Sequence, residues 1–421
     1  MGIQLRPATA VLLLGVVLVV GSIGSVAVTE GVTEEYDPAM EAVELQTDDR
    51  SLWLYTSQKQ SFDRATLALN VVIYEKPERV EQRLLEEGLG DWEEVEEDER
   101  DIAPQETRGS IDNATIQWER TAGAERYVFL TGDGGDWITE SFEVHDGDYL
   151  GSRHHVRIYE PPDGDAEWTA MQAHDEYWDL FDARHVVTSV EDGQSYVEDE
   201  FIDDPTYHVM RDHVGGEDRV DFDGWLTIIQ PEDDDESVLQ SSLFIVGVVL
   251  LGVSAVRTRR DNVVETLDEY SMDDQLRTLG LGFGLIAVYM FVRLAAVGLE
   301  RTVDLPPNTI AAILYPILFA GPPVTAYLLA RRLERTWAFI GASLGFLTAL
   351  LIDYTYLGIT SVPLDILVHR GALAIALGLI AVGGSLTERE NPDLRSYVQV
   401  GVLLWLVATL LPLLKHTPLP V

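Results

Sequence analysis

Cysteine is absent from this 421-residue sequence. Its absence excludes thiol nucleophiles, zinc sites with cysteine ligands, iron–sulfur clusters and anchoring through a lipidated N-terminal cysteine. Any exported domain of the chain must also fold without disulfides. The sequence also lacks a Gly-rich loop with a lysine, the pattern that binds nucleotide phosphates, and therefore gives no sign of a kinase or a nucleotide-driven motor.

Lysine is almost as scarce, because the chain contains only Lys59, Lys76 and Lys415. The 71 acidic residues outnumber the 29 Lys and Arg residues, and the formal net charge is −42. A surface this acidic repels nucleic acid, whose binding requires neutralised phosphates. Such a surface suits molar salt, where the Debye length is about 3 Å and self-repulsion is screened. The composition predicts a halophilic microbe, with an archaeon favoured; the alternative is an ordinary acidic ectodomain.

The negative charge is confined to one part of the chain. Residues 30–240 hold 57 acidic and 15 basic residues, a difference of 42, whereas the remaining residues hold 14 of each and contain the long apolar runs. This division predicts a polytopic membrane protein with one acidic soluble domain. We expect a signal anchor or signal peptide over 1–29, an acidic extracytoplasmic domain over 30–236 and a six-helix transmembrane domain over 237–421.

The apolar runs give the number of predicted spans. The first run, 8–28, is either an uncleaved anchor or a secretory signal, since Ser25-Val26-Ala27 offers a small-x-small cleavage pattern. Further runs of spanning length lie near 238–256, 277–299, 308–330, 337–354, 362–385 and 396–414. The sequence therefore predicts seven spans, or six after cleavage.

Arginine placement predicts how these spans are oriented. Ten arginines fall at one set of span ends: Arg6, Arg257, Arg259, Arg260, Arg277, Arg331, Arg332, Arg335, Arg389 and Arg395. Only Arg301, Arg370 and Lys415 fall at the other. Because cytoplasmic loops carry the excess of positive charge, we expect the amino terminus inside and residues 30–236 and the carboxyl terminus outside. The glycosylation sequon at Asn113 fits an external domain.

The acidic domain has an α+β pattern. Residues 66–74 alternate like a strand, a helix from Pro77 ends at Gly88, and a short helix is expected near 193–202. Further strands are expected near 114–119, 126–131, 138–144, 153–159, 166–173, 185–190 and 224–229. The predicted fold class is an α+β extracytoplasmic domain joined to an all-α transmembrane bundle.

The stretch from Gly151 to Asp192 carries the candidate site. Strand alternation puts Arg153, His155 and Arg157 on one face, and the candidate ligand-binding residues are Arg153, His155, Arg157, His174, Asp175 and His185. Three interpretations remain open. The imidazoles, with Asp175, could converge on a metal ion; the arginines could bind a phosphate or carboxylate; or the residues could form a hydrogen-bonded cluster that holds strands together. We favour the last, assign no metal and predict no cofactor, because the sequence has no HExxH spacing.

The same stretch resembles a known family. Arg153-His154-His155-Val156-Arg157, preceded by Asn70–Tyr74 and the helix from Pro77 and followed by Trp168, Asp175, His185 and Asp192, is similar to the domain at the carboxyl end of LssY-type membrane proteins. The resemblance covers roughly residues 64–204. It implies an envelope-associated membrane protein and no specific activity. The chain departs from the family because further spans follow the domain and the stretch around 88–112 is short and acidic.

A second group of polar residues falls near the predicted outer ends of the spans: Arg293, Asp353, Asp365, His369 and Arg370. Charges in lipid are costly, so these residues must face partners or water. They could form a polar pocket for a lipid headgroup or an ion. We favour the alternative that they are helix-end residues at the interface.

The pattern Gly341-x-Ser343-x-Gly345 fits either a serine nucleophile or close helix packing. Packing is favoured, because Ser343 and His369, the histidine of the membrane spans, are predicted at different depths in the membrane.

Taken together, the sequence predicts a cell-envelope membrane protein with an external ligand- or partner-binding domain. The alternatives are an external hydrolase or transferase acting on a phosphorylated or lipid-linked substrate, and a small transporter or lipid-handling protein. Beyond the bilayer, the expected partners are a lipid headgroup, an anionic ligand or another envelope protein. Whether the protein is an enzyme is left open.

Overall fold

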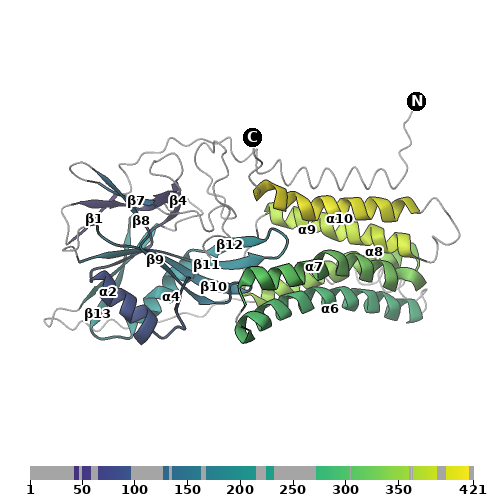
Figure 1. Ribbon diagram of the computed structural model, residues 1–421, viewed down its shortest axis with the longest axis horizontal. Coiled ribbons are helices and arrows are strands. Elements are labelled where there is room, and N and C mark those ends of the chain that lie inside the picture. Colours follow the sequence, from purple (N-terminus) through teal and green to yellow (C-terminus); the bar gives the residue numbers. More distant parts are fainter. Residues whose placement is uncertain are drawn as a thin grey trace, which may run out of the picture.

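The computed structural model describes residues 42–46, 50–57, 65–95, 127–131, 135–162, 167–214, 224–231, 272–303, 305–359, 362, 364–385 and 395–416. These residues form a sheet-rich N-terminal region and a helical C-terminal region that lie end to end (Figure 1). The predicted spans 8–28 and 238–256, the sequon at Asn113 and the predicted strand 114–119 lie outside the described residues.

The smaller sheet has the strand order β1-β2-β7-β3-β4, with β8 paired to β7. All its pairings are antiparallel. The strands are β1 (Ala42–Glu44), β2 (Ser51–Trp53), β3 (Tyr55–Ser57), β4 (Ala65–Ala68), β7 (Tyr127–Leu130) and β8 (Asp136–Thr139). Trp53 and Leu130 of this sheet are buried in one apolar cluster with Tyr159 of β10 and Trp168, which directly precedes β11.

The larger sheet has the order β13-β14-β5-β11-β10-β9-β6, with β12 paired to β11. Only the β5–β14 pairing is parallel. The strands are β5 (Val71–Ile73), β6 (Glu93–Glu94), β9 (Phe142–Gly147), β10 (Ser152–Tyr159), β11 (Thr169–Asp179), β12 (Arg184–Ser189), β13 (Tyr207–His213) and β14 (Trp225–Pro231). The predicted strand over 66–74 is two strands, β4 and β5, in different sheets. The break falls at Asn70, whose buried side chain bonds the backbone of Ala173 in both directions.

Helices cover one face of the larger sheet. They are α2 (Pro77–Gln82), which continues as the π-helical turn η2 (Arg83–Glu87), and α4 (Glu191–Ile202). Val80, Val197 and Phe201 pack with Val156 and Met171 of the sheet. Gly193 is required in the first turn of α4, because a Cβ there would lie 2.5 Å from the Cα atom of His174. The helix therefore lies directly on β11, on the face opposite to the His174 side chain.

The helical region consists of α6 (Met272–Thr302), α7 (Pro307–Leu329), the 3-10 turn η4 (Ala330–Arg332), α8 (Arg335–Tyr356), α9 (Leu364–Gly384) and α10 (Arg395–His416). Among the described residues, four helices are long and apolar enough to cross a membrane, and the apolar part of α10, Ser396–Leu410, is shorter. Gly345 of α8 packs closely on α6, since a Cβ there would lie 2.5 Å from the Cα atom of Gly282. Ser343 donates to the carbonyl of Ala374 in α9 at 2.9 Å, so this glycine-rich pattern serves helix packing.

Strands β10, β11 and β12 lie beside one end of the helical bundle (Figure 1). Two turns of the sheet region insert into this end. The first is the β9–β10 turn, in which the backbone N–H groups of Tyr149 and Leu150 donate to Glu300 at 2.5 and 2.9 Å. The second is the β11–β12 hairpin, whose Phe181 is buried among the helices. The two regions are therefore joined by a packed interface.

Buried ion pairs fix this interface. Arg293 of α6 binds Asp353 of α8 at 2.8 Å and also donates to the carbonyls of Leu150 and Trp178 at 2.5 and 3.0 Å. Arg370 of α9 donates to both carboxylate oxygens of Asp179 at 2.5 Å. Both arginine side chains are at most 3% exposed. Three of the residues that the sequence placed at the interface of the membrane thus hold the sheet region onto the helices.

The remaining members of that polar group have other surroundings. His369 bonds the carbonyl of Ala408 in α10 through Nε2 at 2.7 Å, and its Nδ1 atom lies 2.6 Å from the Arg370 guanidinium. Asp365 lies in the first turn of α9, and its side chain lies outside the part of the chain that the structure describes.

Arg301, at the end of α6, adds an exposed ion pair to the interface of the two regions. It pairs with Asp148 of the β9–β10 turn at 2.6 Å.

Candidate functional site

The register of β10 and β11 builds a polar band on one face of the larger sheet. His155 stands directly opposite His174, Arg153 opposite Glu176, and Arg157 opposite Gln172. Because side chains alternate along a strand, these six residues share the face that lies away from α4. On β9, Glu143 is opposite Arg157 and His145 is opposite His155, which extends the band by one strand.

Three side chains meet at the centre of this band. His155 Nδ1 lies 3.3 Å from His174 Nε2, which in turn lies 3.3 Å from Glu176 Oε2. His155 Nδ1 lies 3.6 Å from Glu176 Oε1, and His185 Nδ1 of β12 lies 3.9 Å from the same oxygen. All four residues are buried. The histidines that the sequence singled out therefore converge on one carboxylate.

The histidine nitrogens on the far side of the rings are also bonded. His155 Nε2 lies 3.0 Å from Glu143 Oε2, and His185 Nε2 lies 2.9 Å from the carbonyl oxygen of Tyr149. His174 Nδ1 lies 3.3 Å from the side-chain amide of Gln172. These bonds orient each ring so that its other nitrogen points toward Glu176.

Burial sets the charge state of the cluster. It lowers the pKa of His155 to about 3 and that of His185 to about 4, although neighbouring carboxylates oppose the shift. Burial also opposes ionisation of Glu176, but the positive charges around it, with Arg153 Nε at 2.7 Å, outweigh burial and hold its pKa well below the usual range. At neutral pH His155 and His185 are therefore neutral and Glu176 is ionised.

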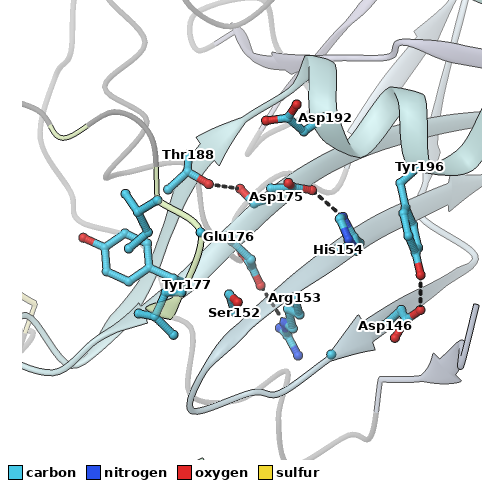
Figure 2. A pocket seen from close by; sticks show the side chains of 14 residues that line it. Asp146, Ser152, Arg153, His154, Asp175, Glu176, Tyr177, Thr188, Asp192 and Tyr196 are labelled. Carbon is cyan, nitrogen blue, oxygen red and sulfur yellow. Dashed lines mark hydrogen bonds and ion pairs between the residues drawn. The ribbon is translucent and has the colours of Figure 1, made fainter. Parts of the chain in front are cut away.

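A pocket of about 360 Å³ opens beside this cluster, at the end of the sheet nearest the bundle (Figure 2). Its wall comes from β9, β10, β11, β12, α4 and the turn Leu357–Ile359 that follows α8. The polar residues of the wall are Asp146, Ser152, Arg153, His154, Asp175, Glu176, Tyr177, Thr188, Asp192 and Tyr196. Arg153 and Glu176 belong to both the pocket wall and the polar band, so the pocket and the histidine cluster are adjacent.

The pocket wall is organised by its own contacts. His154 Nδ1 lies 2.6 Å from Asp175 Oδ1, and the His154 ring stacks on Tyr196 with centroids 3.6 Å apart and planes 10° apart. The Tyr196 hydroxyl donates to Asp146, which also accepts the backbone N–H of Asp91 at 3.0 Å. Figure 2 shows Asp192 above the His154–Asp175 pair, on the first turn of α4. Carboxylates therefore line the α4 side of the pocket, whereas the Arg153 side chain is directed to the other face of the sheet, where it pairs with Glu176 at 2.7 Å.

The site residues predicted from the sequence divide into two groups. His155, His174 and His185 come together, whereas Asp175 points to the other face of β11 and pairs with His154 instead. Arg157 is not part of the pocket wall and lies near two carboxylates, with its Nε atom 3.3 Å from Glu140 and 3.5 Å from Glu143. Each described arginine of the motif is thus matched with acidic side chains.

Two acidic residues of the histidine cluster, Glu176 and Glu143, are not among the residues predicted from the sequence. Glu176 carries a signal that was available, because it lies two residues after His174 and alternation puts the two side chains on one face. Glu143 carries no such signal, because its place beside His155 depends on the register of β9 against β10.

Comparison with known proteins finds no matching family model, no matching curated protein and no matching solved structure.

Proposed function

We propose that the chain is a cell-envelope membrane protein whose extracytoplasmic domain binds a ligand that carries an ammonium group, such as a phosphoethanolamine headgroup, at the membrane surface. The observation that carries the proposal is the pocket between the ends of β10 and β11 and the turn Leu357–Ile359. Because this turn directly follows a candidate membrane span, the pocket lies at the level that lipid headgroups would occupy.

The charges of the pocket support this ligand class. Asp146, Asp175 and Asp192 offer carboxylates to an ammonium group, and Tyr196 adds an aromatic ring next to them. Lipid headgroups and free phosphorylated amino alcohols share this chemistry. We also propose that residues 64–204, which contain the strands of the pocket, form an LssY-type domain. The acidic surface of the protein would then be exposed to molar salt.

We further propose that the pocket side of the membrane is extracytoplasmic, as the arginine bias predicts. Two of the three basic residues that run against that bias, Arg301 and Arg370, pair with Asp148 and Asp179 of the sheet region. Their position at the outer ends of the spans is thereby accounted for by ion pairing rather than by topology.

The absence of cysteine provides a direct test of orientation. Asp199 is exposed on α4 and Glu334 is exposed at the opposite end of the bundle, before α8. We expect Asp199→Cys to react with a membrane-impermeant maleimide in intact cells and Glu334→Cys to react only after lysis. The reverse pattern would reject an extracytoplasmic pocket. The wild-type chain serves as the control for background labelling.

Ligand binding is tested by removing one carboxylate of the pocket. Asp192→Asn is expected to weaken binding of phosphoethanolamine to the purified protein about 10-fold, since a hydrogen bond to a charged group contributes about 1.5 kcal/mol or more. Asp199→Asn on the same helix, outside the pocket, is the matched control and should leave the dissociation constant unchanged. Calorimetric titration measures both.

The source of the ligand is resolved by a second arm of the same experiment. Nanodiscs of phosphatidylethanolamine are compared with nanodiscs of phosphatidylglycerol, which lacks the ammonium group. A preference for phosphatidylethanolamine without binding of the soluble headgroup identifies a lipid ligand, and binding of the soluble compound identifies a free one. Equal effects of Asp192→Asn and Asp199→Asn, or no binding in either arm, would refute the proposal.

A second candidate function is an external hydrolase or transferase that acts on a phosphorylated or lipid-linked substrate. It is favoured by one observation, namely that Glu176 borders the pocket and also contacts His174 and His155. An enzyme would be distinguished from a binding protein by one measurement, the hydrolysis or transfer of the headgroup ester. Release of headgroup or phosphate that increases linearly with protein concentration would favour the enzyme.

A further inference from the structure

The histidine cluster has the spacing of a metal site. The pairs His155 Nδ1 to His174 Nε2 and His174 Nε2 to Glu176 Oε2 are both 3.3 Å apart. All three groups can offer ligand atoms within 4.8 Å of one another. Ligand atoms that bind one ion tetrahedrally at about 2.0–2.1 Å lie about 3.3 Å from each other. The side chains therefore already stand at coordination spacing.

The surrounding contacts match those of metal-binding histidines. Such histidines usually donate their second ring N–H to a carboxylate or a backbone carbonyl, which fixes the tautomer. Glu143 occupies this position for His155 at 3.0 Å. Gln172 Nε2 lies 3.3 Å from His174 Nδ1, and Gln172 Oε1 accepts from Arg157 at 3.5 Å. A half-turn of the amide would present Oε1 to His174 Nδ1 in exchange for that long contact with Arg157. Both rings can thus turn an unprotonated nitrogen toward Glu176.

The position of Arg153 decides which carboxylate oxygen is available. Its Nε atom donates to Glu176 Oε1 at 2.7 Å, whereas Oε2 is the oxygen that faces His174 at 3.3 Å. The guanidinium therefore holds one oxygen, which also lies 3.6 Å from His155 Nδ1, and leaves the other oriented toward His174. His185 Nδ1, 3.9 Å from Oε1, stands on the remaining side of the carboxylate.

We propose that His155 Nδ1, His174 Nε2 and Glu176 Oε2 bind a divalent transition-metal ion such as Zn²⁺, with a fourth position left for water or His185. Two imidazoles and one carboxylate are a ligand set that zinc accepts. Glu176 also belongs to the pocket wall, so the site lies next to the pocket. The proposal is independent of the proposed headgroup binding, because it rests on the three side chains alone.

The test uses the full-length protein in detergent after treatment with a chelator and dialysis. Calorimetric titration with Zn²⁺ is expected to show one ion per chain. Titration with Co²⁺ is expected to give the strong visible absorption of four-coordinate cobalt. No stoichiometric binding of Zn²⁺ by the wild-type chain, or only the weak spectrum of six-coordinate cobalt, would overturn the proposal.

Variants assign the ligands. His174→Gln is expected to raise the Zn²⁺ dissociation constant by more than 100-fold, beyond the roughly 10- to 100-fold that loss of a supporting partner costs. Glu143→Gln keeps the shape of the residue that supports His155, and it is expected to raise the Zn²⁺ dissociation constant about 10-fold. This second variant keeps the test informative if His174→Gln fails to fold. His208→Gln, an exposed histidine on β13, is the control and should change nothing. Zinc binding that survives both His174→Gln and Glu143→Gln unchanged would also overturn the proposal.

Discussion

Replacing Asp179 with alanine is expected to lower the free energy of unfolding by about 3–5 kcal/mol, because it leaves a buried arginine without its counter-ion. Arg370 donates to both oxygens of Asp179 and is 2% exposed. The same carboxylate accepts the backbone N–H groups of Phe181 and Asp182 at 2.9 and 3.1 Å. The Tyr177 hydroxyl donates to it as well, at 3.3 Å, so its removal leaves four donor groups without this acceptor at once.

The measurement is denaturant unfolding in detergent, with Asp136→Ala on β8 as the exposed control. A double variant separates the charge from the packing. Asp179→Leu with Arg370→Met removes both charges, and we expect it to recover most of the loss, since replacing a whole buried ion pair is often neutral. If Asp179→Ala were as mild as Asp136→Ala, or the double variant were as unstable as the sum of the single ones, Asp179 would not hold the two regions together.

The pH dependence of this contact has a defined sign. Burial opposes ionisation of Asp179, but the Arg370 charge and the backbone donors outweigh burial and hold the pKa below its usual range. A carboxyl group with a depressed pKa contributes stability that is present above its ordinary pKa and is lost as the pH falls through the folded-state value. The contribution of Asp179 is therefore complete at neutral pH and disappears only in acid.

Local patterns predicted the parts of the structure that depend on neighbouring residues. Alternation along β10 placed Arg153 and His155 on one face, and the helix from Pro77 begins where the sequence predicts it. The carboxylate of the histidine cluster was assigned wrongly to Asp175, although the same alternation applied to β11 selects Glu176. The period of the strand alone is sufficient to put Glu176, and not Asp175, on the face of His174.

Contacts between distant residues had no local signal. Asp179 and Arg370 are 191 residues apart, and Arg293 and Leu150 are 143 apart. The sequence identified the basic members of these pairs only because charge within a membrane span is costly. Asp179, the acidic partner of Arg370, belongs to a charge-rich domain in which one more aspartate does not stand out, and the partner of Arg293 in the sheet region is a backbone carbonyl. Pairing of this kind is decided by how two separately folded regions pack, and no periodicity encodes it.

Replacing Phe181 with alanine is expected to cost about 3–5 kcal/mol, because it removes a large side chain from a buried site that cannot refill. The Phe181 ring lies 5.9 Å from Phe346 and 6.1 Å from each of Tyr289 and Trp405, with the Arg370 guanidinium 4.8 Å above it. Helices α6, α8, α9 and α10 thus all contact one residue of the β11–β12 hairpin.

Phe283 provides the matched control for this variant. It lies on α6 and is 66% exposed on the outside of the bundle, so Phe283→Ala removes the same ring without opening an internal cavity. We expect Phe283→Ala to change the free energy of unfolding by less than about 1 kcal/mol, and Phe181→Leu to lose less than Phe181→Ala. Proteolysis of the folded protein should also separate the two regions faster in Phe181→Ala, because the ring joins the hairpin to all four helices. If Phe181→Ala and Phe283→Ala were equally stable, the hairpin would contact the bundle without stabilising it, and the ion pairs of Arg293 and Arg370 would have to hold the interface alone.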